Sequence, residues 1–293
     1  MLSYRHGFHA GSAADVFKHS VLVFCLEYLR GKDKPFLYID THAGAGWYPL
    51  DTGTGSRGWE RGIGRLGGLG PEAPSLLRRY GSLCGMPLDG PLDGSLDGSL
   101  PCRYPGSPAI AAKLLRAGDR GACFELHPAD FAALEGALGG DRRFSLRHED
   151  GLTGLKSLLP PLCRRALVLI DPAYEDAAEY QALPAALEEA LRRFPAGVYL
   201  VWYPLLGPGA PGSRRRTGDD GGLGEILMAL NGGNRCRVEL HTAPVGSPGL
   251  YGSGLALYNP PWTLKPELEA ALPVLARLLG GGETGWDLDW RVQ

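Results

Sequence analysis

Residues 36–46 have the sequence FLYIDTHAGAG, which predicts the opening of a nucleotide-binding α/β sheet. FLYID is a short apolar strand that ends in an acid, Asp40, and THAGAG follows it as a glycine-rich turn. In the preceding segment, 12–30, apolar residues recur at helical spacing, and Ser12 and Asp15 fit a capping box. We therefore expect a helix, a buried strand and a ligand-binding turn, in that order.

Strands continue to alternate with helices along the rest of the chain. We predict strands at 123–128, 144–151, 166–170, 197–204, 236–243 and 254–262, and helices at 109–117, near 129–138 and after Pro266. This alternation is typical of a doubly wound α/β sheet, in which a ligand lies across the carboxyl ends of the strands. When the strand 36–40, which precedes the glycine-rich turn, is counted as the first, 166–170 is the fourth strand. We expect this fourth strand to lie next to 36–40 in the sheet.

The segment 51–106 differs in composition from the rest of the chain. It is rich in glycine and contains the near-repeat LDGPLDGSLDGSL at 88–100, which is too short and polar to bury a core. We predict a flexible loop within an insertion there. A second Gly/Pro-rich loop is expected at 207–224.

Composition excludes several classes of protein. Thirty Lys and Arg residues against 32 Asp and Glu give a net charge of −2, which excludes a uniformly basic nucleic-acid-binding surface but not a local basic patch. The six cysteines form no CxxC pair, so we expect free thiols in a reducing compartment and no metal site. No secretory signal or membrane-spanning run is evident, which predicts a soluble cytoplasmic protein.

The glycine-rich turn argues against two common nucleotide ligands. Gly44 and Gly46 are present, but Pro49 stands where a dinucleotide fingerprint has its third glycine, and no GK[ST] P-loop occurs. S-adenosylmethionine fits better, since it needs a close backbone approach and acids for its ribose hydroxyls. Asp40 with the turn, Glu125, and Asp150–Gly151 occur in this order at the ends of successive predicted strands.

Asp171-Pro172-Ala173-Tyr174 follows the apolar strand 166–170. N6-adenine and N4-cytosine methyltransferases carry an acid or amide, two prolines and an aromatic residue at this place. The carboxylate of Asp171 and the carbonyl of Pro172 can each accept one N–H of an exocyclic amine, and Tyr174 can stack on an extruded base. Ala173 replaces the second proline without removing a donor or an acceptor.

A second motif, Asn259-Pro260-Pro261-Trp262, is a more literal match to the amine-methylating tetrapeptide. It follows the last predicted strand, which should lie further from the cofactor. We favour Asp171 as the catalytic residue and interpret the second motif as a structural turn.

The N-terminal sequence MLSYRHGFHAGSAADVFKHS, with DKPFLYIDTHAGAG, closely resembles the RlmJ family of 23S ribosomal RNA (adenine-2030)-N6-methyltransferases. Further similar segments are RYPGSPAIA (103–111), ELHPAD (125–130), IDPAYE (170–175), WYP (202–204) and SGLALYNPPW (253–262). The resemblance implies a Rossmann-like class I S-adenosylmethionine-dependent methyltransferase domain at 1–50 and 105–293, with a small insertion subdomain at 51–104.

The resemblance also implies the roles of individual residues. Cofactor contacts would fall on His19, His42, Ser107, Glu125, Asp150, Gly151 and Asp171. Asp171, Pro172 and Tyr174 would form the catalytic motif, and Tyr4, His6 and Lys18 would face the RNA or the target base. The partner would be 23S rRNA before full ribosome assembly, and we expect a monomer without a membrane or an obligate protein partner.

Two alternatives differ in substrate or activity. One is the same chemistry on DNA or another RNA, and the other is a catalytically weakened RNA-binding relative. Because the net charge is slightly negative, RNA binding would depend on local basic residues. The candidates are Arg5, Lys18, Arg57, Arg61, Arg78, Arg79, Arg142, Arg143 and Arg214–Arg216.

Overall fold

The computed structural model describes residues 7, 9–50, 57–88, 101–174, 177–208, 222–231, 233–280 and 284–292. Several residues singled out in the sequence lie outside these ranges: Tyr4, Arg5, His6, most of the 88–100 repeat, and Arg214–Arg216.

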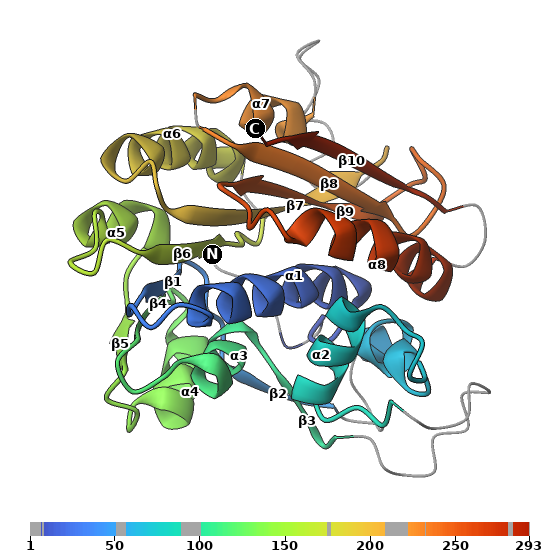
Figure 1. Ribbon diagram of the computed structural model, residues 1–293, viewed down its shortest axis with the longest axis horizontal. Helices are drawn as coiled ribbons and strands as arrows, with labels where there is room; N and C mark the ends of the chain where they lie inside the picture. The colour runs from blue at the N-terminus through green and yellow to red at the C-terminus, as the bar shows by residue number, and fades with distance from the viewer. Residues whose placement is uncertain are drawn as a thin grey trace.

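An eight-stranded sheet forms the centre of the protein (Figure 1). Its strands, in spatial order, are β10 (Trp286–Arg291), β8 (Arg235–His241), β9 (Leu250–Tyr258), β7 (Val198–Leu206), β6 (Ala166–Ile170), β1 (Leu37–Asp40), β4 (Arg120–Phe124) and β5 (Phe144–Arg147). The strands from β7 to β5 are parallel, and β1 lies between β4 and β6. Asp40 pairs in register with Leu169, so the expected neighbourhood of 36–40 and 166–170 is confirmed.

Strand direction changes at the other half of the sheet. β9 runs antiparallel to both β7 and β8, and β10 runs antiparallel to β8. Tyr258, at the end of β9, is paired with Tyr199 near the start of β7. The carboxyl end of β9 therefore lies at the edge of the sheet opposite to the carboxyl ends of β1 and β6.

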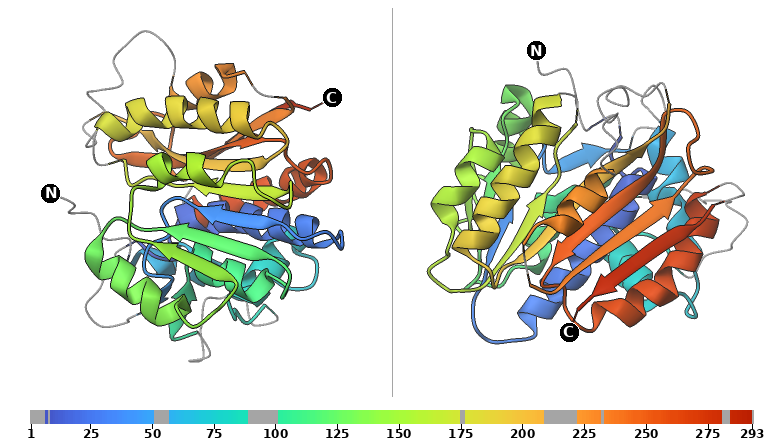
Figure 2. Two further views of the ribbon diagram at one scale, coloured as in Figure 1. Left: turned by 90° about the vertical axis from the view of Figure 1, so that its left-hand side faces the viewer. Right: turned by 90° about the horizontal axis from the view of Figure 1, so that it is seen from above.

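Helices cover both faces of the sheet (Figure 2). They are α1 (Ala13–Arg30), α2 (Ser75–Leu83), α3 (Ser107–Leu114), α4 (Pro128–Leu138), α5 (Gly151–Leu158), α6 (Ala177–Arg193), α7 (Leu223–Ala229) and α8 (Leu264–Leu279). Buried side chains of α1, α2 and α8 form one apolar cluster with the sheet, and those of α5, α6 and α7 form a second. Among the helices described here, none has the length and hydropathy needed to cross a membrane.

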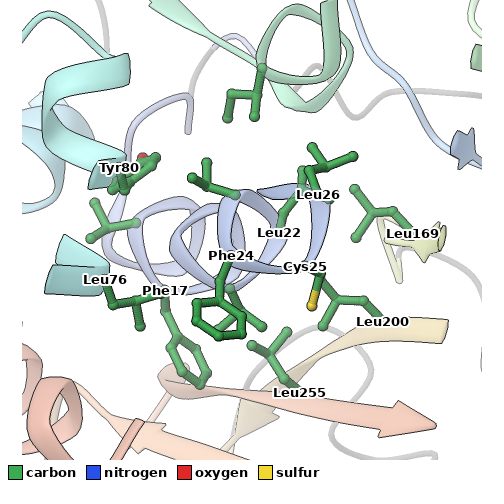
Figure 3. Close-up of a cluster of buried hydrophobic side chains, with 14 of the residues drawn as sticks. Phe17, Leu22, Phe24, Cys25, Leu26, Leu76, Tyr80, Leu169, Leu200 and Leu255 are labelled. Atoms are coloured by element: carbon green, nitrogen blue, oxygen red, sulfur yellow. The ribbon is translucent and has the colours of Figure 1, made fainter. Parts of the chain in front are cut away.

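The first helix, α1, is buried around almost its whole circumference. In Figure 3, Leu76 and Tyr80 of α2 lie on one side of it, and Leu169 and Leu200 of the sheet lie on another. Its start differs from the predicted capping box, because Ser12 makes no side-chain cap hydrogen bond.

Asp15, in the first turn of α1, reaches back one residue further than a capping box requires. It accepts the backbone N–H of Gly11 at 2.9 Å, and its other carboxylate oxygen pairs with Lys18. Asp15 is thus held by two partners at the start of the helix.

The described part of the predicted insertion packs directly on α1. Two 3₁₀ helices, η2 (Arg57–Arg61) and η3 (Ile63–Leu66), precede α2, and the short strands β2 (Trp47–Pro49) and β3 (Arg103–Pro105) pair with each other. Trp59, Ile63 and Tyr80 belong to the same buried cluster as α1. Apolar burial therefore ties this segment to the core of the main sheet.

Some predicted boundaries were wrong. The strand predicted at 144–151 ends at Arg147, because Asp150 instead caps α5 with its side chain. The strand predicted from 123 begins at Arg120 and ends at Phe124. Neither α6 nor β10 was singled out in the sequence.

Candidate active site

The carboxyl end of β1 carries a buried acid. Asp40 is completely buried, and its Oδ2 accepts the hydroxyl of Tyr38 at 2.7 Å. Burial raises the pKa of Asp40 to about 6, although hydrogen bonds from Tyr38 and Ser107 act in the opposite direction. Ser107, at the start of α3, thus meets a carboxylate, one of the two roles that its position suggests.

The glycine-rich turn is held by Glu125. Gly44 has φ +63°, and its N–H donates to Oε2 of Glu125 at 2.8 Å. The N–H of His127 donates to Oε1 of the same carboxylate at 2.6 Å. Burial raises the pKa of Glu125, and these hydrogen bonds offset part of that rise. Two predicted elements of the cofactor site, the turn and Glu125, are therefore brought into direct contact.

Asp150, Gly151 and His42 lie together beside a cavity. Asp150 accepts the N–H of Thr153 at 2.6 Å, and a Cβ on Gly151 would lie 2.0 Å from the carbonyl oxygen of Thr41. A cavity of about 510 Å³ is lined by His42, Asp150 and residues of α5 and α6. Burial lowers the pKa of His42 to about 4, so its ring is neutral at pH 7.

Asp171 follows β6 at the same edge and is joined there by Lys18. The Nζ of Lys18 forms an ion pair with Oδ2 of Asp171 and lies 2.9 Å from Oδ1 of Asp15. Lys18 is only 3% exposed; burial alone would lower its pKa, but the two carboxylates outweigh this effect and raise it. The structure therefore places Lys18 at the acid of the DPAY motif, beside the expected position of a target base and away from the outer surface.

Tyr174 is turned into the protein in this structure. Its φ is +57°, its side chain is 5% exposed, and its hydroxyl donates to the carbonyl oxygen of Trp202 at 2.6 Å. The ring contacts Tyr180 and Trp202, with centroids 4.7 and 5.8 Å away. Stacking of Tyr174 on a base stays a prediction, since this conformation buries the ring against neighbouring aromatic side chains.

Asn259, in the second tetrapeptide, makes structural contacts at the opposite edge of the sheet. Its Nδ2 donates to the carbonyl oxygens of Pro195 and Gly197, both at 2.7 Å. Its backbone N–H donates to the carbonyl oxygen of Asn234. The side-chain bonds join the turn after β9 to the loop before β7, and the backbone bond joins it to the residue before β8. All three lie at the edge of the sheet opposite to Asp171.

His19 lies beside Lys18 on α1 but has different partners. Its Nδ1 is 2.6 Å from the hydroxyl of Tyr104, and its ring stacks on the Tyr104 ring with centroids 5.9 Å apart. Nε2 lies 4.0 Å from Asp15. Asp15 and Tyr104 were not singled out as site residues in the sequence, although both are nearly fully buried polar side chains next to residues that were.

Several of the candidate RNA-binding arginines serve structural contacts. Arg143 binds Asp141 and the carbonyl oxygens of Ala112 and Leu115, and Arg79 pairs with Glu27 and Glu267. Exposed arginines in the described part of the insertion are Arg61, Arg65, Arg78 and Arg103. Of these, Arg65 and Arg103 were not among the candidates.

One group of three possible metal ligands occurs among the described residues. Glu239 and His241 of β8 and Asp287 of β10 approach one another at the far half of the sheet. Glu239 is hydrogen-bonded by Tyr203, and His241 lies 3.6 Å from Asp287, so these side chains already have protein partners.

Two features define the class of protein. The strands follow the order β5-β4-β1-β6-β7, after which an antiparallel β9 lies between β7 and β8, and acids gather at the carboxyl ends of β1, β4 and β6. These features define a class I S-adenosylmethionine-dependent methyltransferase. A family model described as "Ribosomal RNA large subunit methyltransferase D, RlmJ" matches residues 33–292. The chain belongs to this family.

Curated relatives and a solved structure agree with the family. The chain is 37% identical over 294 residues to "Ribosomal RNA large subunit methyltransferase J" of Haemophilus influenzae, covering 99% of each chain. It is 38% identical to the protein of the same name from Escherichia coli, covering 100% of this chain and 99% of the other. A crystal structure of a Legionella pneumophila protein superposes with a TM-score of 0.82 at 32% identity, covering 97% and 98% of the two chains.

Proposed function

We propose that this protein transfers a methyl group from S-adenosylmethionine to N6 of one adenine, position 2030, in 23S ribosomal RNA. The observation that carries the proposal is Asp171, which follows the strand beside β1 and is joined by the buried Lys18. The relatives that match the whole chain bear the name of ribosomal RNA large subunit methyltransferases.

The site residues divide into a cofactor edge and an acceptor motif. The turn at Gly44, with Glu125, Asp40, His42 and Asp150, offers backbone groups and carboxylates for the amino-acid and ribose ends of the cofactor. The cofactor, when bound, supplies an electrophilic methyl group on a sulfonium.

The acceptor motif makes the adenine amine a better nucleophile. The exocyclic nitrogen is weakly nucleophilic because its lone pair is delocalised into the ring. Asp171 and the carbonyl oxygen of Pro172 each accept one N–H and so favour a tetrahedral nitrogen aligned with the methyl group. Lys18 occupies Oδ2 of Asp171, so Oδ1 is the oxygen proposed to face the amine.

The substrate is proposed to be rRNA that is not yet enclosed in a ribosomal particle, because the target base has to leave its stack to enter the site. The enzyme is proposed to act as a monomer in the cytoplasm, where this RNA is assembled. Light scattering of the purified protein tests the monomer, and a comparison of free 23S rRNA with assembled large subunits as substrates tests the timing.

The test of the activity is methyl transfer from labelled S-adenosylmethionine to protein-free 23S rRNA, with the product nucleoside identified by mass. We expect N6-methyladenosine at one site. Asp171→Asn should reduce the rate by at least about 100-fold, because Asp171 accepts from Lys18 through Oδ2 and would accept from the amine through Oδ1, whereas an amide has only one acceptor atom. Calorimetry measures the cofactor binding of the variant separately. Methylation of DNA or another RNA in place of rRNA would contradict the substrate, and full activity of Asp171→Asn would contradict the catalytic assignment.

A further inference from the structure

Two buried phenols connect the insertion to α1. The hydroxyls of Tyr80 (α2) and Tyr104 (β3) are 2.8 Å apart, and that of Tyr104 is 2.6 Å from Nδ1 of His19. All three residues are at most 1% exposed. Tyr80 lies against α1 in Figure 3.

The same contacts continue from His19 to the acceptor motif. Nε2 of His19 faces Asp15 at 4.0 Å, and Asp15 pairs with Lys18 at 2.9 Å. Lys18 in turn pairs with Asp171. A path of polar contacts between buried side chains therefore runs from the insertion to the acid proposed to receive the adenine amine.

We propose that Tyr104 is a positioning residue: its hydroxyl, supported by Tyr80, fixes the ring of His19 as the neutral tautomer with its proton on Nε2. Through Asp15, this arrangement holds Lys18 at the acceptor motif. The kinetic part of this inference rests on the proposed function, whereas the tautomer is a property of the free protein.

Electrostatics and hydrogen-bond chemistry together set the direction of each contact. The carboxylate of Asp15 lies 4.0 Å from Nε2, beyond hydrogen-bond distance, and its negative charge favours a proton on that nitrogen over a proton on Nδ1. Burial disfavours a charged imidazolium, and Lys18 already supplies the positive charge beside Asp15. Nδ1 is then an acceptor, and the hydroxyl of Tyr104 donates to it. The hydroxyl of Tyr80 donates to the oxygen of Tyr104, and the thiol of Cys84 is the donor in its hydrogen bond with Tyr80.

The insertion is also fixed by its backbone to the start of α1. The N–H of Ile63 donates to the carbonyl oxygen of Gly11 at 2.8 Å, and a Cβ on Gly62 would lie 1.9 Å from that same oxygen. This close approach leaves little freedom for α1 to shift relative to η3. The insertion that carries Tyr80 and Tyr104 is therefore held in a fixed position relative to α1.

The direct test is ¹⁵N NMR of the His19 ring in the free protein at pH 7, assigned with a His19→Gln variant. We expect a single neutral tautomer with the proton on Nε2 in the wild type, and a mixture of ring states in Tyr104→Phe. A wild-type ring that is doubly protonated, or that carries its proton on Nδ1, would overturn the proposal. This result is independent of whether the protein methylates rRNA.

The kinetic test compares Tyr104→Phe with a matched control. Tyr199 is also a fully buried phenol, but its hydroxyl donates to the carbonyl oxygens of Ala190 and Phe194, outside the path. We expect Tyr104→Phe to lower kcat about tenfold, the scale of one buried hydrogen bond, with the KM for rRNA unchanged. Tyr199→Phe should lower thermal stability by a similar amount without lowering kcat. Equal kcat values for Tyr104→Phe and Tyr199→Phe would overturn the positioning role.

Discussion

At the scale of single residues, the polar side chains at the two edges of the sheet differ in what they bind. At the carboxyl ends of β1 and β6, Asp40 and Asp171 lie at the point where the strand order switches, which is the place where open α/β sheets bind their ligands. At the other edge, the side-chain amide of Asn259 donates hydrogen bonds to two backbone carbonyl oxygens. Position in the sheet, more than the letters of a motif, is the reason why we propose Asp171 and not Asn259 as the acceptor residue.

Asn259→Ala is expected to lower stability and to spare activity. It removes two hydrogen bonds and places alanine at φ +49°, so we expect a loss of about 1–3 kcal/mol in the free energy of unfolding. Urea unfolding measures the loss. Asn259→Gly separates the two causes, because glycine tolerates this φ but also lacks the amide. Loss of methyl transfer by the folded Asn259→Ala protein would instead make the second motif functional.

Asp40 is expected to make stability depend on pH. Its pKa is about 6 in the folded protein, against about 4 in an unfolded chain, so the folded state binds the proton more tightly. The resulting stabilisation is complete below pH about 4 and is lost as the pH rises through 6. Relative to Asp40→Asn, the wild type should lose about 2 kcal/mol of unfolding free energy between pH 4.5 and pH 7. Parallel pH profiles for the two proteins would contradict this prediction.

At the scale of elements, close approaches between helices and strands fix the cofactor edge. α5 begins against the turn after β1, and it packs on β4 through Gly154, where a Cβ would lie 2.2 Å from the ring of Phe124. Helix α4, in contrast, carries Gly136 on an exposed face, where a Cβ would have no atom within 4 Å.

These two helical glycines provide a matched pair. Gly154→Ala should lower the free energy of unfolding by about 1–3 kcal/mol, because the ring of Phe124 is fully buried and has little room to move. Gly136→Ala should raise it by about 0.5–1 kcal/mol through helix propensity alone. Thermal unfolding of both variants decides the matter, and a stabilised Gly154→Ala would show that α5 is free to move away from β4.

At the scale of the whole molecule, the net charge of −2 leaves RNA binding to a limited set of cations. Arg79 and Arg143 are engaged in ion pairs, whereas Arg61 and Arg65 are exposed near the start of α1. Because η3 is hydrogen-bonded to the start of α1, the helix that carries Lys18, we expect the exposed side of η2 and η3 to approach the phosphates.

Salt dependence of rRNA binding measures this role. Each phosphate contact contributes about 0.7–0.9 to the slope of log K against log salt. Arg61→Gln should reduce the magnitude of the slope by about that amount, since it removes one cation. Arg192→Gln is the control, because Arg192 is 71% exposed at the end of α6 and pairs with Glu189. An equal change in both variants would place the RNA elsewhere.

Much of the fold could be predicted from local sequence. Apolar runs such as 166–170 and the spacing within 12–30 correctly indicated β6 and α1, because a strand or helix must match its own burial period. The helix α6 was missed, since its pattern is interrupted by Pro184, and β10 was missed because its charged residues alternate at an exposed edge. The cap of α1 was only partly predicted, because Asp15 accepts the backbone N–H of Gly11 instead of that of Ser12, and it also pairs with Lys18 one turn further along the helix.

The sequence by itself determined the strand, acid and glycine turn at 36–46, the DPAY motif after β6, and the family to which the chain belongs. The tertiary structure alone decided that Lys18 pairs with Asp171, 153 residues away, and that β9 runs antiparallel and carries Asn259 to the opposite edge. The physical reason is that local periodicity reports which side of an element is buried. It does not report the direction in which a strand enters the sheet, or which buried charge will meet another.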